Sequence, residues 1–332
     1  MHETDTSHIA TASRSARRPR MVVGITGASG FIGSVLVRRH LEAGDFVRCL
    51  TRNPHARWPS AVNVIAGDLA NPDAGLVRFA DGLDVLYHCA GEWRDQQRMQ
   101  TVNVDGTQAL LNAAAGRIGR WVQLSSAGVY GRHRTGVISE DTAIDPHGIY
   151  ERTKADADDL VLERGRQRRI ASCAVLRPSI VFGQAMPNQS IAQMARMIQR
   201  RLFFFIGPAG ASANYVHVAD VAEALMLCAT SAAADGRVYN LSNWCTVEEF
   251  AAAIADTLGC PRPRLRLPER AVRCVVWAAN HVAAGPLTRS RVDALVNRSR
   301  YSIQRIQREL NLSLTVSIPT GLAWLVSPRA AA

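Results

Sequence analysis

The chain has 332 residues, of which 47% are apolar and 20% charged, an ordinary composition for a globular protein with a sizeable core. Its 39 basic residues exceed the 28 acidic ones by a formal charge of +11, yet every base except Lys154 is an arginine. Such a uniform preference for arginine makes the charge weak evidence for a nucleic-acid partner. No run of about 18 apolar residues occurs, so we expect no transmembrane segment.

Residues 1–20 are rich in Ser, Thr and Arg and lack the apolar stretch of a secretory signal, so we expect them to form a disordered tail. The seven cysteines are scattered, with no C-x-x-C pair and no histidine at zinc-finger spacing. Reduced thiols in the cytoplasm explain this pattern better than disulfides or a metal centre do. We therefore predict a cytoplasmic protein without a metal site.

Short β-branched runs alternate with helical patterns from Met21 onward. The expected strands cover residues 21–26, 46–51, 62–66, 85–89, 121–125 and 172–176, and the expected helices cover 31–43, 99–115 and 150–167. Parallel neighbours in a sheet need crossover helices, so this alternation predicts an α/β fold with a doubly wound parallel sheet.

Beyond Gly183 the alternation loosens. A helix is expected over 191–201, an apolar run follows at 202–206, and a strand over 238–241 resembles a return to the sheet. We therefore expect one domain over residues 21–182, to which 216–242 return. Residues 183–215 and 243–332 are expected to form a smaller C-terminal lobe.

A glycine-rich turn links the first strand to the first helix. It follows the pattern T-G-x-x-G-x-x-G, and its candidate cofactor contacts are Thr26, Gly27, Gly30, Phe31, Ile32 and Gly33. Such a turn lets the backbone approach a pyrophosphate, while the amides and dipole of the helix N-terminus favour its negative charge. Because a second strand ends about twenty residues later, the motif predicts a dinucleotide-binding domain. The smaller lobe is then the substrate-binding part.

The residue that follows the second strand selects the cofactor. An acidic residue there would bind the ribose hydroxyls of NAD, but this sequence offers Thr51 and Arg52. A hydroxyl beside a cation suits a 2′-phosphate. We therefore predict NADP as the cofactor and keep NAD as the alternative.

Three side chains form a candidate catalytic set. Ser126 follows the expected strand 121–125, at the sheet edge where ligands bind. Tyr150 precedes Lys154 by four residues on a helix, which puts the phenol and the ammonium on one face. A free tyrosine titrates near about 10, and a neighbouring cation lowers that pKa. Lysine suits this position because its compact ammonium also reaches a ribose hydroxyl.

The sequence resembles the extended short-chain dehydrogenase/reductase family, of the NAD-dependent epimerase/dehydratase type. The matching motifs follow the family's order and are Thr26 to Gly33, Gly67-Asp68-Leu69, His88 to Gly91, Asn103 to Thr107, Leu124 to Gly131, Tyr150-x-x-x-Lys154, Arg177 to Gly183 and Val216 to Asp220. The resemblance implies a Rossmann fold and an NAD(P)-dependent enzyme that transfers hydride between nicotinamide C4 and a carbinol or carbonyl carbon. It also implies a possible homodimer.

The resemblance assigns roles to the matching positions. Ser126 would hydrogen-bond the substrate oxygen, Tyr150 would act as general acid or base, and Lys154 would tune Tyr150 and hold the nicotinamide ribose. The further cofactor contacts that it implies are Asp68 and Leu69 at the adenine, Ala90 along the cleft, and Pro178 to Val181 at the carboxamide. His88 and His217 are interpreted as packing or loop-setting residues.

Asn188 and Tyr215 are the candidate substrate-binding residues, since their segments resemble sugar-nucleotide epimerases and reductases. Where many of those enzymes carry a diphosphate-binding arginine, two positions before Tyr215, this chain has Ala213. The arginine-rich segment from Arg262 to Arg308 is the candidate source of a replacement. The end of that segment instead resembles the 3β-hydroxysteroid dehydrogenase and dihydroflavonol reductase branch.

Three hypotheses remain open. The first is a 4-epimerase or 4-ketoreductase acting on a nucleoside diphosphate sugar. The second is a hydroxysteroid or flavonoid-type dehydrogenase for an apolar alcohol or ketone, whose cleft Trp93, Phe203 to Phe205 and Trp244 would line without nearby arginines. The third is a non-catalytic NADP-binding regulator, against which the intact catalytic set argues. No aromatic residues interleave the arginines, so no nucleic-acid partner is expected.

Overall fold

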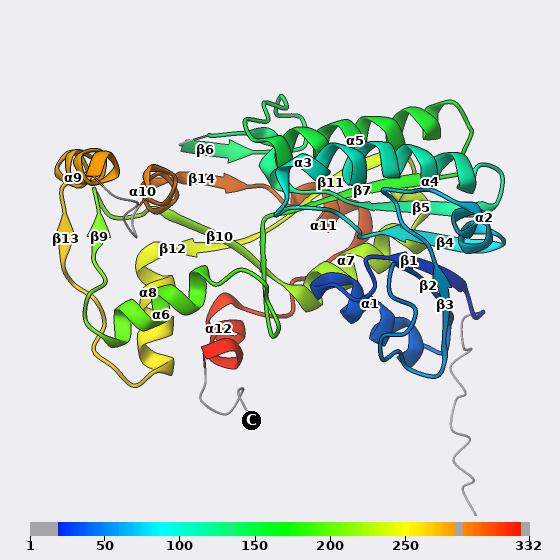
Figure 1. Cartoon of the computed structure of the whole chain (residues 1–332). Coiled ribbons are helices and arrows are strands. Elements are labelled where there is room, and N and C mark those ends of the chain that lie inside the picture. The colour runs from blue at the N-terminus through cyan, green and yellow to red at the C-terminus, as the bar shows by residue number, and fades with distance from the viewer. Residues whose placement is uncertain (1–18, 134, 283–287, 327–332) are drawn as a thin grey trace, which may run out of the picture.

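The computed structural model describes residues 19–133, 135–282 and 288–326. The expected N-terminal tail, 1–20, lies outside these ranges except for its last two residues. Seven parallel strands form a central sheet in the order β11-β7-β5-β4-β1-β2-β3 (Figure 1). Their bounds are β1 Val22–Thr26, β2 Phe46–Thr51, β3 Val62–Ala66, β4 Leu83–His88, β5 Ile118–Leu124, β7 Cys173–Pro178 and β11 Arg237–Leu241. The strand order reverses between β1 and β4, so the predicted doubly wound sheet is confirmed, and its ligand crevice lies at that point.

Helices cover both faces of the sheet. One face packs against α1 (Phe31–Glu42), α7 (Val218–Thr230) and α11 (Gln304–Leu310). The other packs against α2 (Ala74–Ala80), α4 (Gly106–Ala114) and α5 (Ile149–Arg166). The sheet strands are therefore almost continuously apolar, as expected for a parallel sheet buried on both sides.

The expected helix over 99–115 contains a π-helical segment in its first half. It consists of α3 (Gln96–Met99), a π-helical segment η1 (Gln100–Asp105) and then α4. The buried Asn103 lies in the π-helical segment, and its side chain bonds the loop at Glu92 and the hydroxyl of Thr153 on α5. Such π-bulges are frequent at functional sites.

The smaller lobe lies beside the carboxyl ends of the strands (Figure 1). Its sheet contains β8 (Ile180–Phe182), β10 (Ser212–His217) and β12 (Asn243–Thr246). Two short parallel pairs join it, β9 (Phe205–Ile206) with β13 (Arg266–Leu267), and β6 (Thr135–Ile138) with β14 (Arg298–Tyr301). Its helices are α6 Ser190–Gln199, α8 Val247–Thr257, α9 Glu269–Val282, α10 Arg289–Val296 and α12 Ile318–Val326.

One segment of the expected lobe packs elsewhere. Helix α11 and the residues after it lie against the central sheet, where Ile306, Leu310 and Leu312 join the same core as β1 and β11. The buried Asp220 carboxylate accepts hydrogen bonds from the backbone and hydroxyl of Thr315. These contacts tie residues 303–316 to the cofactor side, whereas we expected residues 243–332 to contribute to the lobe. The exact domain boundaries stay a prediction.

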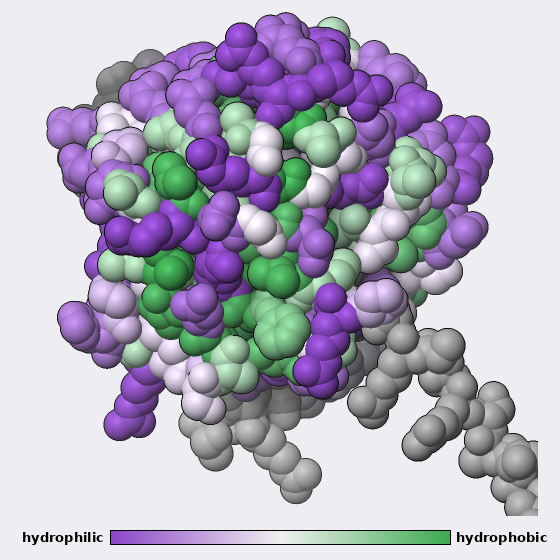
Figure 2. All heavy atoms as spheres, turned by 90° about the vertical axis from the view of Figure 1, so that its right-hand side faces the viewer, coloured by the Kyte–Doolittle hydropathy of each residue, from purple (hydrophilic) through white to green (hydrophobic). Residues whose placement is uncertain are grey.

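The end of the molecule away from the lobe has a mixed surface. Hydrophilic side chains form most of the rim of this face, and hydrophobic ones show between them toward its middle (Figure 2). Within the described ranges, none of the helices combines the length and apolar character that a bilayer span requires.

Candidate active site

The glycine turn sits between β1 and the N-terminus of α1. Gly27 has φ +65, and a Cβ atom on Gly33 would lie 2.2 Å from the Gly27 carbonyl oxygen, so both positions require glycine. The Gly30 amide donates to the Gly27 carbonyl at 2.9 Å, which closes the turn. Because the first turn of α1 carries no acidic residue, its amides and dipole are free to favour an anion. The turn fits a dinucleotide pyrophosphate.

His88 holds this turn from below. Its Nε2 lies 2.9 Å from the Thr107 hydroxyl, which itself donates to the Asn103 carbonyl, so Nε2 must carry the proton. Nδ1 then accepts from the Thr26 hydroxyl at 2.8 Å, while Thr26 accepts from the Ala90 amide at 3.1 Å. Burial, together with the positive charge of Lys154, lowers the pKa of His88 to about 3. His88 is therefore neutral and links the glycine turn to the π-helical segment, a loop-setting role like the one expected.

A cavity of about 590 Å³ opens above the turn and the strand ends. Its lining includes twelve of the residues singled out from the sequence, namely Gly27, Gly30, Phe31, Ile32, Gly33, Ala90, Ser126, Tyr150, Lys154, Pro178, Val181 and Asn188. Trp93 and Glu151 also line it. The crevice that the topology defines is thus the place where the sequence motifs converge.

Four candidate cofactor residues lie outside the lining of this cavity. Thr26 is buried beneath the turn. Arg52 follows β2 and is exposed, while Asp68 and Leu69 follow β3, the next strand outward. The Asp68 carboxylate accepts from the Ala70 amide, and Leu69 packs under Gly106. All four lie at the carboxyl edge of the sheet, on the same side as the glycine turn, where the adenosine end of a dinucleotide would extend.

The three candidate catalytic residues come together at the other end of the cavity. The Ser126 hydroxyl accepts from the Gly128 amide at 3.1 Å and begins a short 3-10 turn, η2 (Ala127–Tyr130). Tyr150 and Lys154 lie one turn apart on α5. Lys154 is only 4% exposed, and its ammonium donates to the Leu124 carbonyl at 2.5 Å. The sole lysine of the chain is therefore anchored at the end of β5, directly below the cavity.

A buried polar network supports Lys154 from the side away from the cavity. Asp158 lies one turn further along α5 and accepts from the Ser125 hydroxyl at 2.7 Å and from Arg177 Nε at 3.0 Å. Arg177 also donates to the Tyr130 hydroxyl at 3.1 Å, which donates to Asn240 Oδ1 at 2.9 Å. The Asp158 carboxylate thus pairs with Arg177 and interacts electrostatically with Lys154, and the network links α5 to the ends of β5, β7 and β11.

The pKa of Tyr150 differs from the sequence-based expectation. Burial, together with the carboxylates of Glu151 and Asp158, raises it to about 12. The lowering expected from Lys154 is absent, because the ammonium is directed to the Leu124 carbonyl. Burial also lowers the pKa of Lys154, against an opposing effect of Asp158. In this arrangement the Tyr150 phenol is protonated at neutral pH.

Two residues near the site were not singled out as site residues. Glu151 is half-buried, packs against Gly128 and Gly148 and brings a carboxylate to the cavity beside Tyr150. Asn103 had been quoted only as part of a motif, although its amide fixes the loop that carries Glu92. Glu151 follows the tyrosine directly and also suits the first turn of a helix, so the sequence alone offered no reason to place it in the cavity.

A second cavity of about 320 Å³ extends from Ser126 into the lobe. It shares Ser126, Pro178, Ser179 and Ile180 with the first. Its remaining lining residues are uncharged, and they are Ala127, Gly128, Met194, Ser212, Ala213, Asn214, Tyr215, Val247, Phe250, Ala294, Leu295, Asn297 and Tyr301. Tyr215 stacks on Phe250 with ring centroids 4.6 Å apart. This cavity is a mainly apolar space next to the candidate catalytic set.

Of the arginines that the structure describes between Arg262 and Arg308, none lines either cavity. Arg266 and Arg273 pair with carboxylates, and Arg300 lies over the ring of Trp244. The aromatic residues expected to line an apolar cleft are also placed differently. Trp93 lines the first cavity, but Phe203 and Phe205, before and at the start of β9, are buried in the core of the lobe with residues of α8 rather than in the crevice.

Comparison with known proteins identifies the class. The chain matches the NAD dependent epimerase/dehydratase family over residues 23–242 and belongs to that family. It is an enzyme of the extended short-chain dehydrogenase/reductase type, as the motifs had indicated.

Two relatives cover most of the chain. The 2-alkyl-3-oxoalkanoate reductase of Stenotrophomonas maltophilia is 28% identical over 94% of this chain and 100% of that protein. Sterol demethylase protein B of Methylococcus capsulatus is 31% identical over 75% of this chain and 78% of that protein. The likeness of this chain to both proteins is one of sequence.

Two solved structures share the fold and carry a nicotinamide dinucleotide. MoeE5 in complex with UDP-glucose and NAD is 26% identical, with a TM-score of 0.69 over 91% of this chain and 96% of that one. RMD from Pseudomonas aeruginosa complexed with NADPH has a TM-score of 0.66 over 91% of this chain and 97% of that one, at 24% identity. A nicotinamide dinucleotide is therefore supported as the cofactor of this chain.

Proposed function

We propose that this protein is an NADP-preferring oxidoreductase that interconverts a ketone and an alcohol on an apolar, uncharged substrate. The observation that carries the proposal is the second cavity, which begins at Ser126 and has no charged side chain among its own lining residues. Apolar walls with a few neutral polar groups are typical of sites that bind hydrophobic small molecules. This is the second of the three hypotheses, with a cleft built from other residues than those expected.

The charges around the two cavities support this substrate class. Lys154 and Glu151 are the charged side chains among the lining residues, and Lys154 is already directed to the Leu124 carbonyl. A nucleoside diphosphate needs cations or backbone amides around its phosphates, and Ala213 supplies no cation at the position where an arginine would be expected. A neutral substrate requires no cations in the cavity.

The relatives support the same class. They include proteins named as a 2-alkyl-3-oxoalkanoate reductase, a 3 beta-hydroxysteroid dehydrogenase/Delta 5→4-isomerase of Mycobacterium tuberculosis and a farnesylated quinoline-oxide ketoreductase of Stigmatella aurantiaca. Each of these names describes a compound with a large apolar part, namely an alkyl chain, a steroid or a prenyl chain, and the alkanoate of the first also carries a carboxylate.

The residues suggest how the reaction proceeds. Bound nicotinamide supplies hydride transfer at its C4 atom. Ser126 would donate to the substrate oxygen, and Tyr150 would pass a proton to or from the same atom. Because burial raises its pKa, the phenol is protonated at neutral pH and can donate to a ketone oxygen in the reductive direction. Lys154 would hold the nicotinamide ribose.

The remaining cofactor contacts follow from position. Arg52, exposed after β2, is proposed to bind the 2′-phosphate that distinguishes NADP from NAD. Asp68 and Leu69 would lie at the adenine, and Pro178 and Val181 at the carboxamide. The glycine turn would hold the pyrophosphate on the α1 amides.

A nucleoside diphosphate sugar is the second candidate substrate. The similarity to MoeE5 bound to UDP-glucose favours it, since this is a 26% identical structure that covers nearly the whole chain. In that case Asn188 and Tyr215 would contact the sugar nucleotide, and cations from outside the described cavity linings would have to approach the phosphates.

The proposal is tested by turnover. The protein with NADPH is offered 3-ketosteroids, alkyl 3-oxoesters, and UDP- and dTDP-4-keto sugars, and NADPH oxidation is followed, with Tyr150→Phe as the blank. We expect saturable oxidation with at least one of the apolar ketones and none with the sugar nucleotides. Turnover of a sugar nucleotide without turnover of any apolar ketone would refute the proposal in favour of the second candidate.

A further inference from the structure

The outer edge of the lobe exposes apolar side chains that no part of the proposed reaction uses. Met197 lies near the end of α6 and Leu202 just after it, and they are 41% and 62% exposed. Leu265 precedes β13 and is 60% exposed. The Phe205 amide donates to the Leu265 carbonyl, so the two leucines lie on neighbouring segments of one edge. Figure 1 shows β9 and β13 side by side at the border of the lobe.

Exposed arginines adjoin these apolar side chains in the sequence. They are Arg196, Arg200, Arg201 and Arg264, all exposed. In the part of the chain that the structure describes, none of the four has a carboxylate partner, whereas the nearby Arg262 and Arg266 pair with Asp256 and Glu248. We call these four arginines together with Met197, Leu202 and Leu265 the basic edge. It has four cations and no acidic member.

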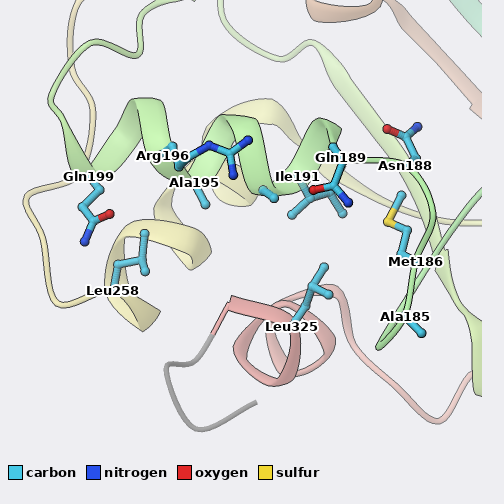
Figure 3. Close-up of a pocket in the computed structure, with 11 residues that line it drawn as sticks. Ala185, Met186, Asn188, Gln189, Ile191, Ala195, Arg196, Gln199, Leu258 and Leu325 are labelled. Carbon is cyan, nitrogen blue, oxygen red and sulfur yellow. The ribbon is translucent and has the colours of Figure 1, made fainter. Parts of the chain in front are cut away.

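A groove of about 280 Å³ leads inward from the basic edge. Figure 3 shows it between α6, which carries Arg196 and Gln199, and Leu325 of α12, with Leu258 near its outer end. Its inner end is lined by Met186 and Asn188, which also line the cavity of the candidate active site. The groove therefore connects the basic edge to residues at the border of the crevice.

We propose that the basic edge docks on an anionic lipid surface. Arginines around exposed apolar side chains match a bilayer interface, where guanidinium groups meet anionic headgroups and leucine side chains leave water. A soluble anion would satisfy the arginines but leave Leu202 and Leu265 in water. No pocket is needed for this binding, since the four cations spread over a surface rather than converge on one point.

Docking at this edge would place the outer end of the groove at the lipid surface. An apolar substrate, as proposed above, partitions into bilayers, and the groove would lead it from the lipid surface toward the active-site border. This route rests on the proposed function, but the docking does not. The two are separated by measuring vesicle binding without any substrate.

The experiment is co-sedimentation of the full chain with vesicles of phosphatidylcholine alone and of phosphatidylcholine mixed with phosphatidylglycerol. Two double variants test the edge, Leu202→Ser with Leu265→Ser, and Arg200→Gln with Arg201→Gln. The control for the leucine pair is Val77→Ser, and the control for the arginine pair is the double variant Arg78→Gln with Arg169→Gln. All three control positions are exposed and lie on the cofactor side. Thermal unfolding confirms that each variant is folded.

We expect binding to the anionic vesicles alone, weakened by salt and weakened at least about tenfold in each edge variant, with both controls binding like the parent chain. Turnover of a micellar or water-soluble substrate should be the same in the edge variants and the parent. Absence of binding to phosphatidylglycerol vesicles, or binding that both edge variants retain, would overturn the proposal. Failure of the proposed function would leave the vesicle result unchanged.

Discussion

The two cavities that meet at Ser126 are built on opposite principles. On the cofactor side, one series of hydrogen bonds runs from Thr26 through His88 to Asn103, and another bond holds Lys154 at the end of β5. On the substrate side, Met194, Phe250 and Leu295 provide apolar walls. Hydrogen bonds fix the positions of polar groups in the first half, whereas the second, under the proposed function, would select a substrate by its shape and apolar character.

This difference separates chemistry from specificity. Groups that would move a proton or hold a cofactor are positioned by the sheet edge and by α5, which bring distant motifs together in a fixed geometry. The walls of the second cavity come from α6, α8, α10 and β10, which lie outside the central sheet.

Removing the proposed proton donor should cause the largest loss of activity. Tyr150→Phe keeps the ring but loses the hydroxyl, so we expect kcat to fall by about a thousandfold, within the range typical of general acid catalysis. NADPH affinity, measured by fluorescence titration, should change little. Tyr239→Phe is the control, because Tyr239 is a buried tyrosine whose hydroxyl bonds Glu309 far from the cavity, and it should retain kcat.

The lysine position is the next largest test. Lys154→Arg keeps the charge, but the planar guanidinium cannot take the place of an ammonium that is 4% exposed beside the Leu124 carbonyl. We expect kcat/KM to fall by about a hundredfold while the far-UV circular dichroism spectrum is retained. Arg152→Lys, at an exposed position of the same helix, should have no such effect. Full activity in Lys154→Arg would remove the reason for the single lysine.

A charge introduced into the substrate half should sharpen the contrast. Ala213→Arg places a cation in an otherwise uncharged cavity, so kcat/KM for an apolar ketone should fall by at least about tenfold, while the Kd for NADPH stays the same. Ala213→Met, which introduces a long but uncharged side chain, serves as the control for side-chain size. An increase in turnover of the apolar ketone in Ala213→Arg would contradict the account of this cavity.

The cofactor preference is a smaller effect. Arg52→Ala should raise the Kd of NADPH by about tenfold and leave that of NADH nearly unchanged, since only the former carries the 2′-phosphate. Arg57→Ala, in the same loop and also exposed, is the matched control. Equal losses for NADPH and NADH in Arg52→Ala would assign the residue to the shared part of the cofactor.

The buried histidine predicts a modest dependence of stability on pH. The pKa of His88 is lowered from 6.5 to about 3, so between these values the unfolded chain binds a proton that the folded chain does not. His88 therefore does not reduce the free energy of unfolding above pH 6.5. As the pH falls below 6.5, that free energy decreases by at most about 1.4 kcal/mol per pH unit. Urea unfolding near neutral and mildly acidic pH should show a smaller loss in His88→Gln than in the parent chain.

Local patterns were sufficient for the cofactor half. The strands lie within a few residues of their expected positions, and the glycine turn and Ser126, Tyr150 and Lys154 meet at one cavity because parallel strand ends share an edge. Each of these motifs depends on neighbours within one turn or one strand. The roles assigned to these residues stay predictions until the variants are measured.

The substrate half depends on contacts that periodicity does not encode. Met194, Phe250 and Leu295 come from three helices widely separated in sequence, and their meeting depends on how the lobe packs. Phe203 and Phe205 looked like cleft residues but face the core instead. The return of α11 to the sheet likewise depends on Ile306 and Leu310 filling a space that only the folded sheet creates.

The most direct test of the uncharged substrate cavity is a comparison of ligands on the NADP-bound protein. Thermal unfolding is followed with a hydroxysteroid or a long-chain secondary alcohol, and separately with UDP-glucose, each at the same saturating concentration. We predict that the apolar alcohol raises Tm and that Ala213→Arg abolishes this shift, while UDP-glucose leaves Tm unchanged. A rise in Tm with UDP-glucose and none with the apolar alcohols would contradict the account.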